Sequence, residues 1–114
     1  MNTARFDPQR AVIEPAKLCD YVLSPAHPVG RFKAAFFAAL GYSRGEWQKL
    51  ADDLRTQHLA QEAERVEANA FGTKYRIVAL LTGPAGHAVA VVSVWIVLRG
   101  EQEPRLVTLY PESS

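Results

Sequence analysis

The stretch that decides the fold runs from Tyr75 to Pro111 and reads YRIVALLTGPAGHAVAVVSVWIVLRGEQEPRLVTLYP. Apolar runs rich in β-branched residues are broken there by the segments TGPAG (82–86) and RGEQE (99–103). Apolar runs separated by short glycine-containing segments are typical of strands joined by hairpin turns. The stretch therefore predicts an antiparallel meander, whose last strand begins at Pro104 and ends at Pro111.

Three amphipathic helices are expected before this meander. Pro15 suits the first position of a helix, because the N–H that proline lacks would have no intrahelical partner there. A second helix is expected from about Val29 to Leu40, with Gly41 ending it in a left-handed conformation. The segment SRGE (43–46) has the spacing of a capping box that opens the third helix. The apolar positions of the three helices are Leu18, Tyr21, Val22, Phe32, Phe36, Phe37, Leu40, Trp47, Leu50, Ala51 and Leu54.

Strand patterns begin after the third helix. Between Glu64 and Ala70, small or apolar residues alternate with polar ones, as in a strand with one buried face. Further strands are expected over Lys74–Thr82, His87–Arg99 and Pro104–Pro111, and Arg10–Glu14 has the pattern of a short edge strand. We therefore predict an α+β fold, in which about three N-terminal helices precede a four-stranded antiparallel meander and pack on one face of it.

Length and composition indicate a small soluble domain. The 114 residues suffice for one hydrophobic core, so we expect a flexible N-terminal arm (1–9), a single domain (10–111) and a C-terminal tail (112–114). A formal net charge of +1 argues against a nucleic-acid binder that relies on bulk charge. The single Cys19 excludes an internal disulfide, and the N-terminus lacks the apolar core of a signal peptide. A cytoplasmic location without membrane contact is expected.

The strand over residues 87–99 is apolar on both faces, which is typical of a strand in the middle of a sheet. With helices on one face, the open face is expected to expose Trp95 and Ser93. These two residues are the predicted interface for a second copy of the chain or for a cognate protein partner. The alternative for Trp95 is a place in the hydrophobic core.

Segments spread over residues 13 to 111 resemble a family of small bacterial domains of unknown function. Members of this family occur alone and as C-terminal modules of large secreted polymorphic toxins, and the resemblance brings no settled activity. The matching segments are KLCDYVL (17–23), HPVGRFKA (27–34), Phe37, LGY (40–42), GTKY (72–75), GPAG (83–86), VWI (94–96) and PRLVTLYP (104–111).

Helices leading into a four-stranded meander, with a last strand reading Thr-x-Tyr-Pro at residues 108–111, are also similar to the barnase/RelE/EndoU-like ribonuclease toxins. That similarity lies at the level of the fold and one short motif. It implies a metal-independent endoribonuclease, or an inactive relative of one, that acts on RNA without a cofactor.

A candidate anion site lies at the start of the second helix. The segment HPVGRFK (27–33) places Arg31 and Lys33 in the first turn, where cations oppose the helix dipole. A bound phosphate would relieve this conflict, and Gly30 would contribute a free backbone N–H. The alternative is that His27 belongs to a turn and that the two cations are solvated.

A metal-independent ribonuclease needs a base for the ribose 2′-hydroxyl, an acid for the leaving oxygen and a cation near the phosphate. His27 is the candidate base, and Lys33 or Arg105 is the candidate cation. Thr108 or Tyr110 would supply a hydrogen-bonding group. Strand alternation puts Arg105 and Thr108 on opposite faces, so these two converge only if a bulge intervenes. The alternative for each residue is a structural role.

No metal site is expected, because the histidines are isolated and no acidic triad accompanies them. Asp20 is expected to form a surface ion pair with Lys17, three residues before it. Two functions remain open at this point. One is a toxin-type ribonuclease-like domain, and the other is a non-catalytic interaction module that acts as a homodimer or binds a partner.

Overall fold

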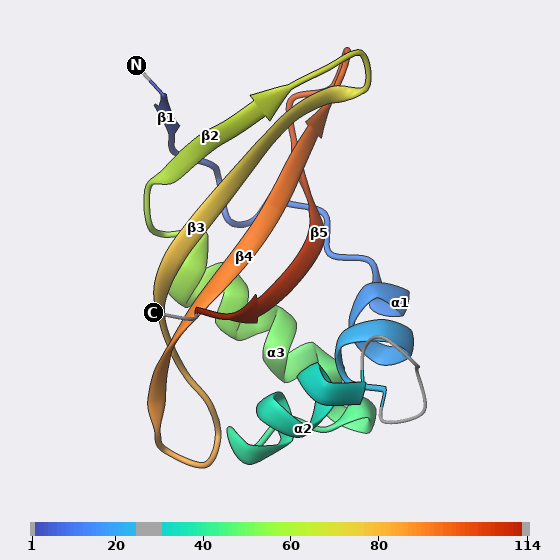
Figure 1. Cartoon of the computed structure of the whole chain (residues 1–114), viewed down its shortest axis with the longest axis vertical. Helices are drawn as coiled ribbons and strands as arrows, with labels where there is room; N and C mark the ends of the chain where they lie inside the picture. The colour runs from blue at the N-terminus through green and yellow to red at the C-terminus, as the bar shows by residue number, and fades with distance from the viewer. Residues whose placement is uncertain (1, 25–30, 113–114) are drawn as a thin grey trace.

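The computed structural model describes residues 2–24 and 31–112, with the side chains of Arg31 and Phe32 outside the described part. Helical segments from the first half of the chain lie against one face of an antiparallel sheet (Figure 1). The helical elements are α1 (Pro15–Lys17), η1 (Leu18–Val22), α2 (Arg31–Ala39), η2 (Arg44–Glu46), α3 (Trp47–Asp53) and η3 (Leu54–His58). The strands are β1 (Thr3–Ala4), β2 (Ala63–Ala68), β3 (Gly72–Thr82), β4 (Ala88–Leu98) and β5 (Pro104–Pro111).

The sheet follows the order β1-β2-β3-β4-β5, and each neighbouring pair is antiparallel. The predicted α+β class and antiparallel meander are therefore confirmed. The prediction of four strands was wrong, because Thr3 and Ala4 pair with Glu64 and Ala63 and add a fifth strand at the edge. A strand of two residues is too short to carry the alternation by which strands are found in a sequence.

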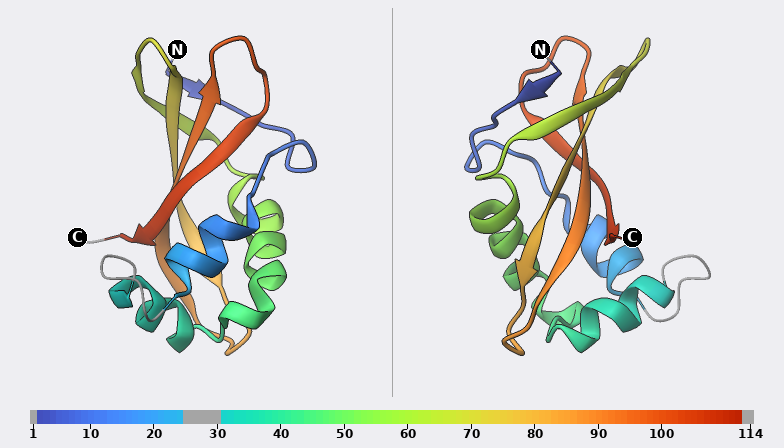
Figure 2. Two further views of the ribbon diagram at one scale, coloured as in Figure 1. Left: turned by 90° about the vertical axis from the view of Figure 1, so that its right-hand side faces the viewer. Right: turned by 60° about the vertical axis from the view of Figure 1, so that its left-hand side comes forward.

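The outer part of the sheet extends beyond the helices. Figures 1 and 2 show the β2–β3 turn and the β4–β5 turn projecting together past the helical layer. In β2 only Ala63 is buried, and Val66 is 53% exposed. The expected buried face of this strand was therefore wrong, because the alternating pattern is present but no helix covers it.

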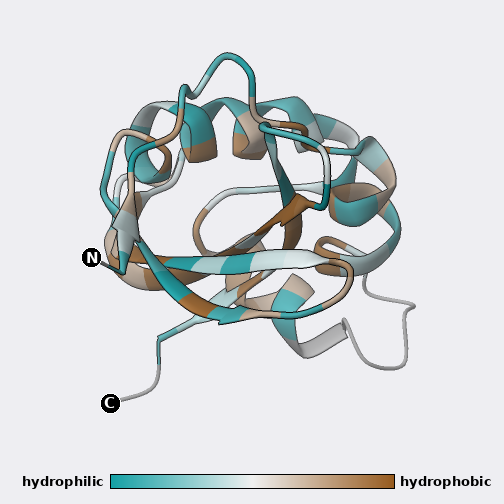
Figure 3. Cartoon of the chain, turned by 90° about the horizontal axis from the view of Figure 1, so that it is seen from above, coloured by the Kyte–Doolittle hydropathy of each residue, from teal (hydrophilic) through white to brown (hydrophobic). Residues whose placement is uncertain are grey.

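The hydrophobic core lies between the helices and the covered face of β3, β4 and β5. Viewed from above, the helices turn their hydrophobic sides toward the sheet (Figure 3). At about 25 cal/mol per Å², burial of apolar area of this kind is the main stabilising contribution to folding. The largest fully buried apolar side chains are Leu18, Val22, Phe37, Leu50, Leu54 and Leu59 from the helical half, and Ile77, Leu81, Val91, Trp95 and Leu109 from the sheet.

Trp95 and Ser93 lie on the covered face and are fully buried, so the prediction that they form an exposed interface was wrong. The sequence could not select the face, because both faces of β4 are apolar. The position of Ser93 in the core has a physical reason. Its Oγ accepts a hydrogen bond from Trp95 Nε1 at 2.8 Å and lies 2.8 Å from Nδ1 of the fully buried His58. The Trp95 N–H and the Ser93 hydroxyl both have hydrogen-bond partners in the core as a result.

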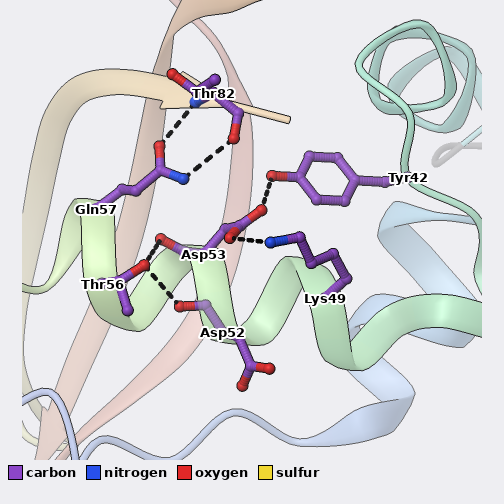
Figure 4. Close-up of polar contacts among 7 residues, drawn as sticks. All are labelled: Tyr42, Lys49, Asp52, Asp53, Thr56, Gln57 and Thr82. Carbon is purple, nitrogen blue, oxygen red and sulfur yellow. Dashed lines mark hydrogen bonds and ion pairs between the residues drawn. The ribbon is translucent and has the colours of Figure 1, made fainter. Parts of the chain in front are cut away.

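The end of α2 is fixed to α3 by a buried polar contact. Gly41 has the predicted left-handed conformation, with φ of 101°. The hydroxyl of buried Tyr42 then donates to Asp53 Oδ2 at 2.6 Å, and Lys49 Nζ contacts Asp53 Oδ1 at 3.0 Å (Figure 4). The expected capping box is not formed, because the Ser43 hydroxyl donates to the Glu46 carboxylate.

One side chain ties η3 to the end of β3. The Gln57 side-chain amide donates to the Thr82 carbonyl at 3.1 Å, and its oxygen accepts from the Thr82 N–H at 2.7 Å (Figure 4). Because both bonds involve one backbone residue, they fix the register of the helix against the strand. The helical layer is therefore held to the sheet by polar contacts as well as by the core.

We predict that Asp53→Ala lowers the free energy of unfolding by about 2–4 kcal/mol, because it leaves the buried Tyr42 hydroxyl without its acceptor. Asp52→Ala is the matched control, since Asp52 is the exposed neighbour of Asp53 (Figure 4) and should change stability by less than about 0.5 kcal/mol. Urea denaturation of the three proteins measures both effects. Equal stability of the two variants would contradict a structural role for the Tyr42–Asp53 contact.

A second prediction concerns pH. Burial lowers the pKa of His58 from 6.5 to about 4. The Ala79 backbone acts in the opposite direction and raises the pKa by less. Between these two values the unfolded chain binds a proton that the folded chain does not bind. The free energy of unfolding should therefore be unaffected above about pH 6.5 and fall as the pH is lowered toward 4, by about 3 kcal/mol in total.

Chemical denaturation at several pH values measures this dependence. In His58→Gln the contribution of this group disappears, so the curve should fall less steeply between pH 6.5 and 4 than that of the wild type. His87→Gln is the control, because His87 is exposed and its loss should leave the steep fall in place. Identical curves for wild type and His58→Gln would rule out His58 as the cause.

Candidate functional site

A β-bulge in β5 determines which side chains meet at the edge of the sheet. Thr108 pairs with Val94 and Leu106 with Trp95, so Val107 is an extra residue without an opposite partner. Arg105 pairs with Ile96, two residues from Val94 in β4. Since residues two apart in a strand share a face, the bulge places Arg105 and Thr108 on the same face. Strand alternation required a bulge for Arg105 and Thr108 to share a face, and the bulge is present.

Lys33, in the first turn of α2, reaches across to this strand. Its Nζ donates to Thr108 Oγ1 at 3.0 Å, and the two residues are 75 positions apart in the chain. The same ammonium lies 5.0 Å from the ring centroid of Tyr21 and 5.7 Å from that of Tyr110. Both rings lie within the range of a cation–π contact. Lys33 is thus held in one place by a hydroxyl and two aromatic faces.

Lys33, Thr108 and Tyr21 border a cleft between the first helical segment, α2 and β5. The cleft has a volume of about 470 Å³, which lies within the usual range for sites that bind small molecules or parts of larger ones. Figure 2 shows α1, η1 and α2 beside the C-terminal half of β5, and residues of these elements line the cleft. Its lining residues are Glu14, Ala16, Lys17, Asp20, Tyr21, Lys33, Val107 and Thr108.

Arg105 does not line the cleft, although it shares a face with Thr108. Its side chain lies 3.1 Å from Glu101 and 3.7 Å from Glu14. Its backbone is fixed as well, because Val12 forms a parallel bridge with it. The edge strand expected over residues 10–14 is reduced to this single bridge. Arg105 is therefore a partner of carboxylates, and one of them, Glu14, belongs to the cleft.

Asp20, the second carboxylate of the cleft, pairs with Arg44 at 2.8 Å. The expected Asp20–Lys17 ion pair is not formed. Across the side chains that the structure describes, neither Lys17 nor Lys33 has a carboxylate within 4.0 Å. Each acid of the cleft therefore has an arginine partner, which Glu14 shares with Glu101, whereas neither lysine has a carboxylate partner among the described side chains.

Of the predicted site residues, Lys33, Thr108 and Tyr110 lie together, and Arg105 lies nearby in an ion pair. His27 and Gly30 lie outside the described residues, and so does the Arg31 side chain. Sequence reasoning missed Lys17 and Glu14 as cleft residues. It placed Tyr21 on the apolar face of the first helix, and Tyr21 does pack against the core, but it lines the cleft as well. No local signal could have placed Tyr21, since its contact with Lys33 joins separate helices.

The described residues give little support for a thiol nucleophile, a metal site or a membrane-spanning helix. Burial and the neighbouring Asp20 carboxylate raise the pKa of the Cys19 thiol, which is the opposite of what a nucleophile needs. Within residues 2–24 and 31–112, no three metal-ligating side chains come together. In the same ranges no helix is long and apolar enough to cross a membrane.

The fold is similar to that of a chain in a contact-dependent growth inhibition toxin–immunity protein complex from Klebsiella pneumoniae 342. The TM-score is 0.59 with 14% sequence identity, and the alignment covers 95% of this chain and 98% of the other. At this identity the likeness concerns the fold alone. None of the curated proteins compared with the chain matches it significantly. The model of DUF6883, a domain of unknown function, matches residues 6–113, and the chain therefore belongs to this family.

Proposed function

We propose that the cleft is the active site of a metal-independent endoribonuclease of the kind mounted on bacterial toxins. The observation that carries this proposal is the position of Lys33. Its ammonium has no carboxylate partner among the described side chains. Thr108 and two tyrosine rings hold it in place, and Lys33 lines the cleft. A cation that is already in place stabilises negative charge without reorganising during the reaction.

The proposed reaction is an internal transfer at an RNA phosphate. The ribose 2′-oxygen attacks the neighbouring phosphorus, a new P–O2′ bond forms and the P–O5′ bond breaks. The 2′-hydroxyl proton goes to a base, and the leaving 5′-oxygen takes a proton from an acid. The products are a 2′,3′-cyclic phosphate and a 5′-hydroxyl end. No metal or cofactor takes part in this balance.

The described residues supply part of this chemistry. Lys33 would neutralise the charge that grows on the non-bridging oxygens in the transition state, and Thr108 would orient the ammonium. Tyr110, whose ring lies beside Lys33, would donate a hydrogen bond from its hydroxyl to the phosphate. His27 is the proposed base, and it follows Ser24 by only three positions in the sequence.

The comparisons support this proposal at the level of the fold. The similar chain belongs to a complex of a toxin with its immunity protein, which supports a place in a toxin system and a cognate protein partner. An RNA substrate also places the site of action in the cytoplasm. These expectations belong to the proposal and depend on the cleavage experiment.

We predict that purified protein cleaves total RNA in excess chelator and leaves 2′,3′-cyclic phosphate ends that mass spectrometry identifies. Lys33→Met keeps an unbranched side chain that is one atom shorter and removes its charge, and it should lower the cleavage rate about 10²- to 10³-fold. His27→Ala should lower the rate by a similar factor, because it removes the proposed base.

Arg99→Ala is the matched control, because Arg99 is an exposed cation on the β4–β5 turn at the far end of the sheet. It should cleave RNA at the wild-type rate. Intact RNA at high protein concentration, or equal rates for Lys33→Met and Arg99→Ala, would refute the proposal. Circular dichroism of each variant separates a loss of chemistry from a loss of fold.

A second candidate function is a non-catalytic homodimer, favoured by the open face of the sheet. Val78 is 48% exposed and Leu80 62% exposed, which is high for aliphatic side chains in the middle of a sheet. We predict that light scattering finds a dimer if this face is the interface, and that Leu80→Glu converts it to a monomer. A monomeric wild type at millimolar concentration would remove this alternative.

A further inference from the structure

Both acids of the cleft are paired with arginines, whereas its two lysines have no carboxylate partner among the described side chains. Glu14 and Asp20 are both bound by arginines that lie outside the lining, namely Arg105 and Arg44. The carboxylates are far enough from both lysines that no ion pair forms inside the cleft, as judged over the described side chains. Glu101 shares Arg105 with Glu14, so the four cations and three carboxylates in and around the cleft carry a formal charge of +1, which favours an anionic ligand.

We propose that Arg44 and Arg105 are positioning residues that hold Asp20 and Glu14 away from the ligand, so that Lys17 and Lys33 bind two neighbouring phosphates of one RNA strand. The inference rests on the proposed function, since it concerns how the same cleft holds its substrate. It assigns Arg105 a different role from the direct phosphate contact expected from the sequence.

The ligand class follows from the proposed function and from the number of cations in the cleft. A nucleic-acid strand carries one phosphate per nucleotide, so a cleft lined by two lysines can offer one ammonium group to each of two phosphates. Tyr21 also lines the cleft, where its ring lies against the Lys33 ammonium. A cleft of about 470 Å³ has room for part of one strand but not for a duplex.

Both arginines already have carboxylate partners. Arg105 has contacts to Glu101 and Glu14 and a side chain that is only 34% exposed. Arg44 donates to Asp20 at 2.8 Å. Without these partners, each carboxylate would repel an incoming phosphate and attract a lysine of the cleft. Loss of either arginine is therefore expected to weaken binding without removing a ligand contact.

The test uses a fluorescent single-stranded oligonucleotide with 2′-deoxyribose, which lacks the attacking hydroxyl and cannot be cleaved by this reaction. Its affinity is measured by anisotropy between 50 and 200 mM salt. Two phosphate contacts predict a slope of about −1.4 in log K against log salt, or about a sevenfold loss of affinity over that range. Lys17→Met and Lys33→Met should each make the slope shallower by about 0.7.

Arg105→Ala should weaken binding about fivefold at low salt, as expected for one uncompensated charge beside the ligand. The double variant Arg105→Ala/Glu14→Gln should restore most of the affinity, because it removes the carboxylate as well. Arg44→Ala and Arg44→Ala/Asp20→Asn repeat the test at the second pair. Arg76→Ala and Arg76→Ala/Glu64→Gln form the matched control, an ion pair of 3.2 Å on β2 and β3 whose loss should not change binding.

Several outcomes would overturn the inference. A slope unchanged by Lys17→Met excludes the second phosphate contact, and an Arg105 variant that Glu14→Gln does not rescue excludes the positioning role. Equal affinity for a duplex of the same sequence excludes single-strand recognition. Failure of RNA cleavage, with these binding results intact, would refute the ribonuclease proposal and leave a strand-binding site. RNA cleavage without the predicted salt dependence and rescue would support the ribonuclease proposal and refute the positioning role of the arginines.

Discussion

The pairing of β3 with β4 is the constraint on which the rest of the fold depends. The two strands pair along their full length, from Gly72 opposite Leu98 to Thr82 opposite Ala88. Because the register is continuous, every second residue of β4 is turned toward the helices, including Trp95. The helical layer packs on that face, and β5 is added at the far side. The position of the cleft therefore depends on how β5 continues this ladder.

The bulge at Val107 then converts an ordinary edge strand into one side of a cleft. Without the extra residue, strand alternation would turn Thr108 toward the core and Leu109 away from it. With it, Leu106 and Leu109 are both buried, and Thr108 is presented to Lys33. One inserted residue thus satisfies the core and the cleft together, which is consistent with the frequent occurrence of bulges beside functional sites.

The sequence predicted the fold where the signals were local and long. Pro15, Gly41 and the glycine-containing turns marked the ends of elements, because their backbone preferences act within a few residues. The covered face of β4 was not predictable, since both faces are apolar and the partner of Ser93 is 35 residues away. The cleft was predictable only in part. Thr108 and Lys33 were proposed by chemistry, but the bulge that brings them together leaves no mark on the alternation of RLVTLY (105–110).

Net charge was the most misleading property of the sequence, because it averages over pairs that cancel. Twelve acidic and thirteen basic residues give a formal charge of +1 and no indication of an anion site. What a ligand meets depends instead on which charges remain unpaired where it binds. Arg44 and Arg105 pair with the acids of the cleft from outside it, and Lys17 and Lys33 have no carboxylate partner among the described side chains. The proposed phosphate site is therefore compatible with a nearly neutral chain, because the positions of ion pairs, rather than their number, determine the local field.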